Sequence, residues 1–149
     1  MDSLYFEDYR PGEQFRSLAR TVTETDLVNF VALSGMYESL FMDREYLANS
    51  RYDGRLVPGA LTYALSEGLV IQTGVLHDRG LAFLGAEIRA EKPVFVGDTI
   101  HVEVSVVEKR TTRHADRGIV LTHHEVINQR SELVMDLRVT RMIRARDCR

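Results

Sequence analysis

A single glutamate interrupts the most apolar segment of the chain and is the first candidate for chemistry. Glu67 lies eight residues after Gly59, within residues 58–75, which are mostly apolar. A carboxylate that is buried without partners costs several kcal/mol, so such a residue usually has a partner or a function. We therefore consider Glu67 as a catalytic carboxylate, with the alternative that it lies at a rim or pairs with an arginine such as Arg89.

Histidine and cysteine, which also commonly carry chemistry, form no recognisable site in the sequence. His123 and His124 are neighbours in an expected strand, so they must point to opposite faces and cannot share a metal ion. The one cysteine, Cys148, allows neither an internal disulfide nor a thiolate zinc site. We predict no metal and no resident cofactor, and we expect ordinary roles for the histidines, which are His77, His101, His114, His123 and His124.

Helical patterns dominate the first half of the chain. Thr23 and Asp26 are spaced as a capping box, apolar residues follow at helical spacing, and Gly35 supplies the stop. Residues 36–55 are expected to form a loop with a short helix at about residues 44–48. The main helix is predicted to begin at residues 58–59 and to end near Gly74. It is apolar on nearly all sides, which is typical of a buried helix.

Strand patterns fill the second half, over residues 81–89, 98–106, 119–128 and 133–143. In the second of these the apolar residues 100, 102, 104 and 106 alternate and must share one face. Short polar turns between successive strands predict an antiparallel meander. Only this sheet can cover the apolar helix, so we predict an α+β hotdog fold, an antiparallel sheet wrapped around one long central helix. A length of 149 residues allows one such domain, residues 1–149.

The composition excludes several classes of function. A net charge of −3 disfavours general nucleic-acid binding, which needs a basic face. The acidic start of the chain has no apolar stretch of the kind found in signal peptides. Ser66, Glu67 and Gln72 interrupt the longest apolar segment, so we expect no membrane span. The single cysteine fits a cytoplasmic protein.

Several short motifs, taken in order, resemble the MaoC-like (R)-specific enoyl-CoA hydratase/dehydratase family. They are Tyr-Phe-Glu-Asp-Tyr at residues 5–9 with glycine 12 and phenylalanine 15, Arg-Thr-Val-Thr-Glu at 20–24, phenylalanine 30 with Leu-Ser-Gly at 33–35, Pro-Val at 93–94, Gly-Asp-Thr-Ile at 97–100, Asn-Gln at 128–129 and Glu-Leu-Val at 132–134. The resemblance runs from about residue 5 to residue 140. It implies a hotdog domain that acts on an acyl thioester by adding or removing water.

The loop that the resemblance makes catalytic departs from the family pattern. The family carries an Asp, then Asn-Pro, an apolar residue and a His; here Met36 stands at the Asp position and Phe41 at the His position. Neither side chain can move a proton at neutral pH, so the usual hydration mechanism cannot run on them. A family His-Gly is replaced by Pro58 and Gly59. The Gly59 N–H, at a helix N-terminus, remains suited to hold the thioester carbonyl.

Substitute groups for this lost pair are Tyr37 and Glu38 in the same loop and Glu67 in the main helix. For Glu38 the alternative is a solvated loop carboxylate. Glu67 shares a helix face with Tyr63, which we include with Gly59 among the substrate-binding residues. A glycine at the helix start and a Glu two turns later also resemble the hotdog acyl-CoA thioesterases, in which such a Glu attacks the thioester or activates water.

Three functions therefore remain open. They are a divergent hydratase or dehydratase, which would be a lyase; an acyl-CoA thioesterase that uses Glu67; and a non-catalytic subunit or acyl-CoA-binding module. The resemblance implies coenzyme A or phosphopantetheine as part of the substrate. It further implies a homodimer or higher homo-oligomer, or else a heterodimer with a hydratase chain whose loop is intact. The net charge and the interrupted apolar segment predict no nucleic-acid or membrane partner.

Overall fold

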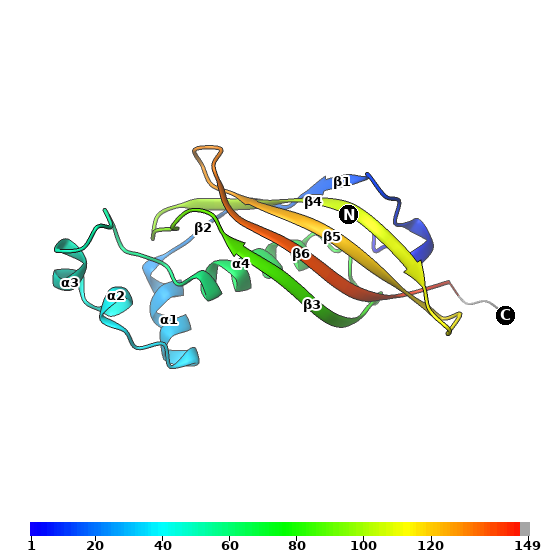
Figure 1. Cartoon of the computed structure of the whole chain (residues 1–149), viewed down its shortest axis with the longest axis horizontal. Coiled ribbons are helices and arrows are strands. Elements are labelled where there is room, and N and C mark those ends of the chain that lie inside the picture. The colour runs from blue at the N-terminus through cyan, green and yellow to red at the C-terminus, as the bar shows by residue number, and fades with distance from the viewer. Residues whose placement is uncertain (147–149) are drawn as a thin grey trace.

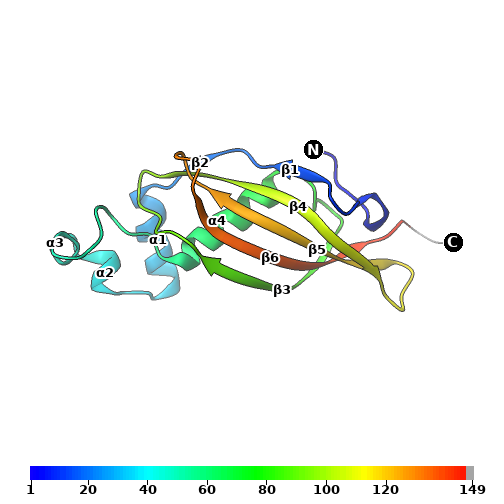
Figure 2. The same cartoon turned by 45° about the horizontal axis from the view of Figure 1, so that its top comes forward.

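One long helix lies along the concave face of a curved antiparallel sheet (Figure 1). The computed structural model describes residues 1–146, so Cys148 falls outside the described residues. The helix is α4 (Gly59–Gln72). The six strands are β1 (Gln14–Arg16), β2 (Arg20–Thr21), β3 (Gly80–Ala90), β4 (Thr99–Thr111), β5 (Arg117–Ile127) and β6 (Leu133–Arg144). This confirms the predicted sheet wrapped around one central helix, and Figure 2 shows the long strands crossing α4.

Three helices gather beside the N-terminal end of α4, namely α1 (Glu24–Ser34), α2 (Ser39–Met42) and α3 (Arg44–Ala48). The short helix η1 (Phe6–Asp8) lies at the opposite end of the molecule and packs against β5. The capping box of α1 is confirmed, because Thr23 and Asp26 exchange side-chain to backbone hydrogen bonds of 2.9 and 3.1 Å. Gly35 ends α1 at a φ of 74°. Sequence reasoning missed α2, since a helix of one turn has no periodicity to detect.

The strand order corrects the predicted meander. The sheet runs β1-β4-β5-β6-β3, and β2 pairs with β4. Only β4, β5 and β6 form a meander, because only they are joined by short turns. β3 pairs with β6 instead of β4, and residues 91–98 carry the chain across to the far side of the sheet. This connection passes the N-terminal end of α4 and helps to form the cavity described below.

The core lies between α4 and the inner face of the sheet. Alternating residues of β4 are buried there as predicted, namely Ile100, Val102, Val104 and Val106. The expectation that α4 is covered on all sides is wrong for the single chain, since Ala60, Ala64 and Ile71 are exposed. Within residues 1–146, no helix combines the length and apolarity needed to cross a bilayer.

Candidate functional site

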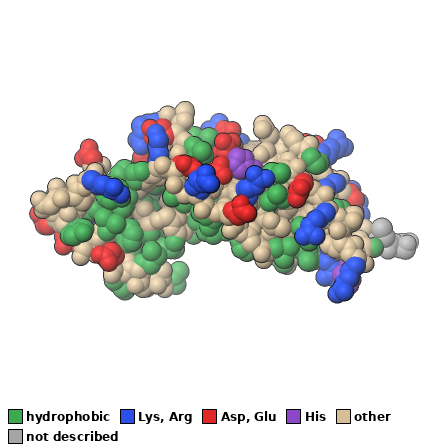
Figure 3. Space-filling view, in the orientation of Figure 1, with side chains coloured by type: hydrophobic (Ala, Val, Ile, Leu, Met, Phe, Trp, Pro, Cys, Tyr) green, Lys and Arg blue, Asp and Glu red, His purple; other side chains and the backbone are tan. Residues whose placement is uncertain are grey.

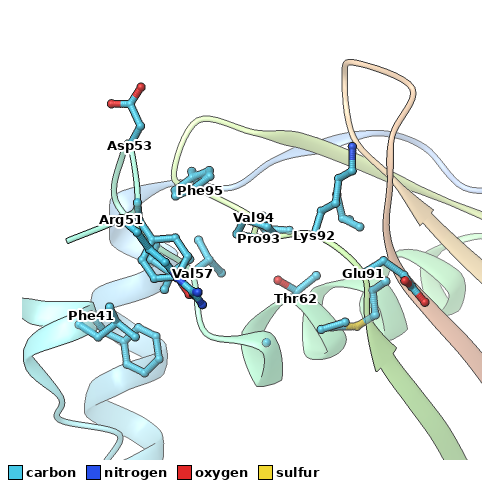
Figure 4. A pocket seen from close by; sticks show the side chains of 17 residues that line it. Phe41, Arg51, Asp53, Val57, Thr62, Glu91, Lys92, Pro93, Val94 and Phe95 are labelled. Carbon is cyan, nitrogen blue, oxygen red and sulfur yellow. The ribbon is translucent and has the colours of Figure 1, made fainter.

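A cavity of about 690 Å³ opens at the N-terminal end of α4 (Figure 4). Its apolar wall consists of Leu40, Phe41, Leu56, Val57, Ala90, Pro93, Val94, Phe95, Val134 and Met135. Its other lining residues are Arg51, Tyr52, Asp53, Gly59, Thr62, Glu91 and Lys92. The apolar wall with few polar groups is typical of a small-molecule site.

Backbone pairing holds the start of α4 against this cavity. Val57 donates a hydrogen bond to the Val94 carbonyl at 2.9 Å, and Val96 donates to the Arg55 carbonyl at 2.9 Å. The Arg55 side chain in turn pairs with Glu24 of α1 at 3.0 Å. The position of the helix start is therefore set jointly by α1 and by the connection between β3 and β4.

The first turn of α4 presents backbone donors to the cavity. The Pro58 carbonyl accepts from the N–H groups of Leu61 and Thr62 at 3.0 and 3.1 Å, so the N–H of Gly59 lies ahead of the first intrahelical bonds. Gly59 is exposed, and a Cβ added to it would meet no atom within 4 Å. A free N–H at the positive end of a helix is suited to bind a carbonyl oxygen on which negative charge develops.

The loop around α2 contributes an apolar wall to the cavity. Phe41 lines the cavity from α2, as Figure 4 shows, while Met36 is half-buried. Tyr37 is 67% exposed, and the exposed Glu38 uses its carboxylate to accept from the Ser39 N–H at 3.0 Å as the cap of α2. Among the described residues, the cavity is lined by neither Tyr37 nor Glu38.

Glu67 lies on α4 outside this cavity and forms an ion pair with Arg141 of β6. The alternative that Glu67 pairs with an arginine is confirmed. The partner is not Arg89, the example suggested from the sequence, because Arg89 lies 3.9 Å from Glu91 on the edge of the sheet. The Glu67 side chain is 18% exposed, so pairing describes it better than a position at a rim. Burial and the neighbouring Glu67 charge raise the pKa of Tyr63, which links these two predicted residues electrostatically.

His124 faces the same buried cluster from β5. Its Nδ1 lies 4.0 Å from Glu67 Oε1, and its Nε2 lies 2.8 Å from the hydroxyl of Thr122. Burial, reinforced by Arg141 and His123, lowers the pKa of His124 to about 3, so the ring is neutral at pH 7. The predicted opposite facing of His123 and His124 is confirmed, because His123 pairs with Asp136 on the outer face at 2.7 Å.

Sequence reasoning missed polar residues both in the cavity and in the buried cluster around Glu67. Arg51, Thr62 and Lys92 line the cavity but lie in segments without a recognised motif. Arg141 carried a usable signal, because it continues the buried alternation of β6 after Val139. A charged residue in that pattern indicates a buried partner. Over residues 1–146, no cluster of His, Cys, Asp or Glu is arranged to hold a metal ion.

The match to a known family spans most of this architecture. Residues 7–128 match the family described as the MaoC like domain. The chain belongs to the MaoC-like domain family. It is similar to Protein MaoC of Klebsiella aerogenes, with 36% identity over 111 residues, which are 74% of this chain and 32% of that protein. It also resembles the (R)-specific enoyl-CoA hydratase of Aeromonas caviae, with 31% identity over 99 residues, 66% of this chain and 72% of the relative.

Solved structures agree with this MaoC-like assignment. The X-ray structure of the monoamine oxidase regulatory protein from Archaeoglobus fulgius superposes with a TM-score of 0.90 at 33% identity, covering 99% of this chain and 98% of that chain. The double-hotdog protein RV0216 of Mycobacterium tuberculosis superposes with a TM-score of 0.87 at 22% identity, covering 99% and 46%, and supports the hotdog fold. The chain spans less than half of the length of the Klebsiella relative.

Proposed function

We propose that this MaoC-like chain binds an acyl thioester, with coenzyme A as the thiol, in the cavity at the start of α4. The observation that carries this proposal is a largely apolar cavity of about 690 Å³ that meets the free N–H of Gly59. An acyl chain matches the apolar wall, and the thioester carbonyl matches the N–H at the helix end. The similar Aeromonas caviae protein is named as a hydratase of enoyl-CoA.

Two cationic side chains that line the cavity suit the coenzyme A portion of the ligand. Arg51 is stacked over the ring of Tyr52 at 5.1 Å, and Lys92 pairs with Glu132 at 2.9 Å. Both residues are largely exposed, and guanidinium and ammonium groups bind phosphates through charge-assisted hydrogen bonds. We assign the phosphates of coenzyme A, or of a phosphopantetheine carrier, to this side of the cavity.

The reaction we favour is hydration of an enoyl thioester or the reverse dehydration. Met36 and Phe41 supply no proton transfer, so the acid–base group must come from another residue. Tyr37 or Glu38 can serve if the loop around α2 shifts toward the cavity, and Glu67 is the third candidate. Family membership favours this class of reaction, and the departure at Met36 and Phe41 makes this chain a divergent member.

Thioester hydrolysis by Glu67 is the second candidate function, and one observation favours it. Glu67 Oε1 is buried and makes no hydrogen bond within the described part of the chain. A carboxylate oxygen of this kind is available to a water or a thioester carbon. The ion pair with Arg141 and the absence of Glu67 from the cavity lining within residues 1–146 weigh against it.

A non-catalytic binding subunit is the third candidate, because Met36 and Phe41 lack transferable protons.

We further propose that two copies of the chain associate along β3. This strand lies at the edge of the sheet and exposes apolar side chains over its length, namely Leu81, Phe83, Leu84 and Ile88. Figure 3 shows hydrophobic side chains gathered along this edge. Exposed Ile71 of α4 lines a groove with Leu81 and Phe83, so the apolar surface continues from strand to helix. A long apolar edge strand is a template for pairing with another chain. A heterodimer with an intact hydratase chain would use the same edge.

The experiment that separates these functions is an assay of the purified chain with saturated and 2-enoyl-CoA thioesters. Free thiol and enoyl absorbance are followed in the same wells. Loss of enoyl absorbance without thiol release supports the hydratase. Thiol release that is abolished by Glu67→Gln and kept by Glu38→Gln supports the thioesterase. Binding without turnover supports the non-catalytic subunit, and the absence of binding overturns the proposed function.

A further inference from the structure

A buried polar cluster lies beneath α4, apart from the candidate thioester site. It consists of Tyr9, which follows η1, Glu67 of α4, His124 of β5 and Arg141 of β6. Tyr9 and His124 are 2% and 0% exposed, and Arg141 is buried as well. Polar groups in such a position are expected to be fully hydrogen-bonded, so any atom without a partner needs an explanation.

Three polar atoms of this cluster have no hydrogen-bond partner within residues 1–146. They are the hydroxyl of Tyr9, Oε1 of Glu67 and Nδ1 of His124. The last two lie 4.0 Å apart, which is too long for a direct hydrogen bond and suits two atoms bridged by a water. Each buried unpaired group would otherwise destabilise the fold, because it has lost its hydrogen bonds to water without gaining new ones.

The hydrogen-bonding roles of these atoms are complementary to water. The Thr122 hydroxyl lies 3.4 Å from the Val139 carbonyl and 2.8 Å from Nε2 of His124, and we infer that it donates to the carbonyl and accepts from Nε2–H. The His124 Nδ1 therefore carries a lone pair and needs a donor. The Glu67 Oε1 also needs a donor, and the Tyr9 hydroxyl needs an acceptor. A water molecule between Glu67 and His124 can donate to both of these acceptors.

The space available agrees with this chemistry. A cavity of about 20 Å³ lies beside the His124 ring; it is lined by Tyr9, Thr122, His124 and Arg141 and by apolar side chains including Val104 and Val120, while Glu67 is not among its lining residues. A single water needs roughly 10–15 Å³ of such space and 2–4 polar partners. Arg141 also lines the groove between the end of α4 and β3.

We propose that Glu67 and His124 are bridged by one internal water molecule. The water connects α4 to β5, and it holds the His124 ring in a single tautomer. This site shares Glu67 with two of the candidate reactions but does not depend on either of them. Its existence gives Glu67 a structural role that requires neither substrate nor turnover.

The test is water–protein NOE spectroscopy of the full chain, with nitrogen shifts of the His124 ring measured on the same sample. The expected result is a cross-peak between a long-lived water and the Val120 methyl groups, with Nδ1 acting as an acceptor at neutral pH. The cross-peak should disappear in His124→Phe and persist in the control Tyr5→Phe. A wild-type spectrum without the cross-peak, with one proton shared directly between Glu67 and His124, would overturn the site even if His124→Phe fails to fold.

Discussion

Removing Arg141 should destabilise the fold strongly, because it leaves the Glu67 carboxylate buried without its cation. Loss of one member of a buried ion pair typically costs about 3–5 kcal/mol. We take the lower end, about 3 kcal/mol, for Arg141→Met, because the Glu67 side chain keeps 18% exposure and can recruit some water. For a domain of this size, that loss corresponds to a fall in Tm of roughly 6–12 °C.

The double variant Glu67→Leu/Arg141→Met separates the ion pair from the loss of packing. Because the double variant leaves no charge of this pair in the core, its free energy of unfolding should be about 2 kcal/mol higher than that of Arg141→Met. Urea unfolding at one fixed protein concentration measures all the variants, since association along β3 would make stability depend on concentration. Arg138→Leu, an exposed arginine on the same strand, is the matched control and should change stability by less than about 0.5 kcal/mol. Additive effects of the two core substitutions would refute the coupling of Glu67 with Arg141.

Three further predictions follow from the site and its surroundings. Burial lowers the pKa of His124 from 6.5 to about 3, so the protein takes up a proton when it unfolds between these pH values. The free energy of unfolding should therefore fall by up to about 1.4 kcal/mol per pH unit on acidification, and this pH dependence should be flatter in His124→Phe. Installing Met36→Asp with Phe41→His should raise enoyl-CoA hydration by about 10²-fold or more, as measured by enoyl absorbance, whereas an unchanged rate would mean that the loop does not reach the substrate. Phe83→Lys on β3 should convert an associated species to monomer in sedimentation, while Leu33→Lys, at an apolar residue of α1 that is even more exposed, should not.

Much of the fold could be predicted because its signals are local. The capping box of Thr23 and Asp26, the glycine stop of α1 and the alternation in β4 each depend on neighbours in the sequence. The pairing of β3 with β6 could not be predicted in this way. It is a long-range choice, fixed by how the sheet closes around α4, and no turn of recognisable length joins the two strands.

The candidate site likewise contains residues that the sequence could place and residues that it could not. Gly59 and Phe41 could be placed from the sequence because motif order locates them, and the structure brings both to one cavity. Glu67 was noticed for its apolar surroundings, but its partner Arg141 lies 74 residues away and only the folded sheet brings them together. Tyr9 could not be linked to this cluster, since nothing near it in the sequence distinguishes a buried hydroxyl from an exposed one.

The Gly59 N–H offers the most direct test of thioester binding at the start of α4. Gly59→Pro removes this donor at a helix position that accepts proline, and Gly59→Ala keeps the donor and adds a carbon into open space. Affinities for a 2-enoyl-CoA and for free coenzyme A would be measured by calorimetry on both variants and on wild type. We predict that wild type prefers the thioester and that Gly59→Pro loses about 1 kcal/mol of that preference, roughly fivefold, while Gly59→Ala retains it. Equal affinity of wild type for the thioester and for free coenzyme A would contradict binding of the carbonyl at Gly59.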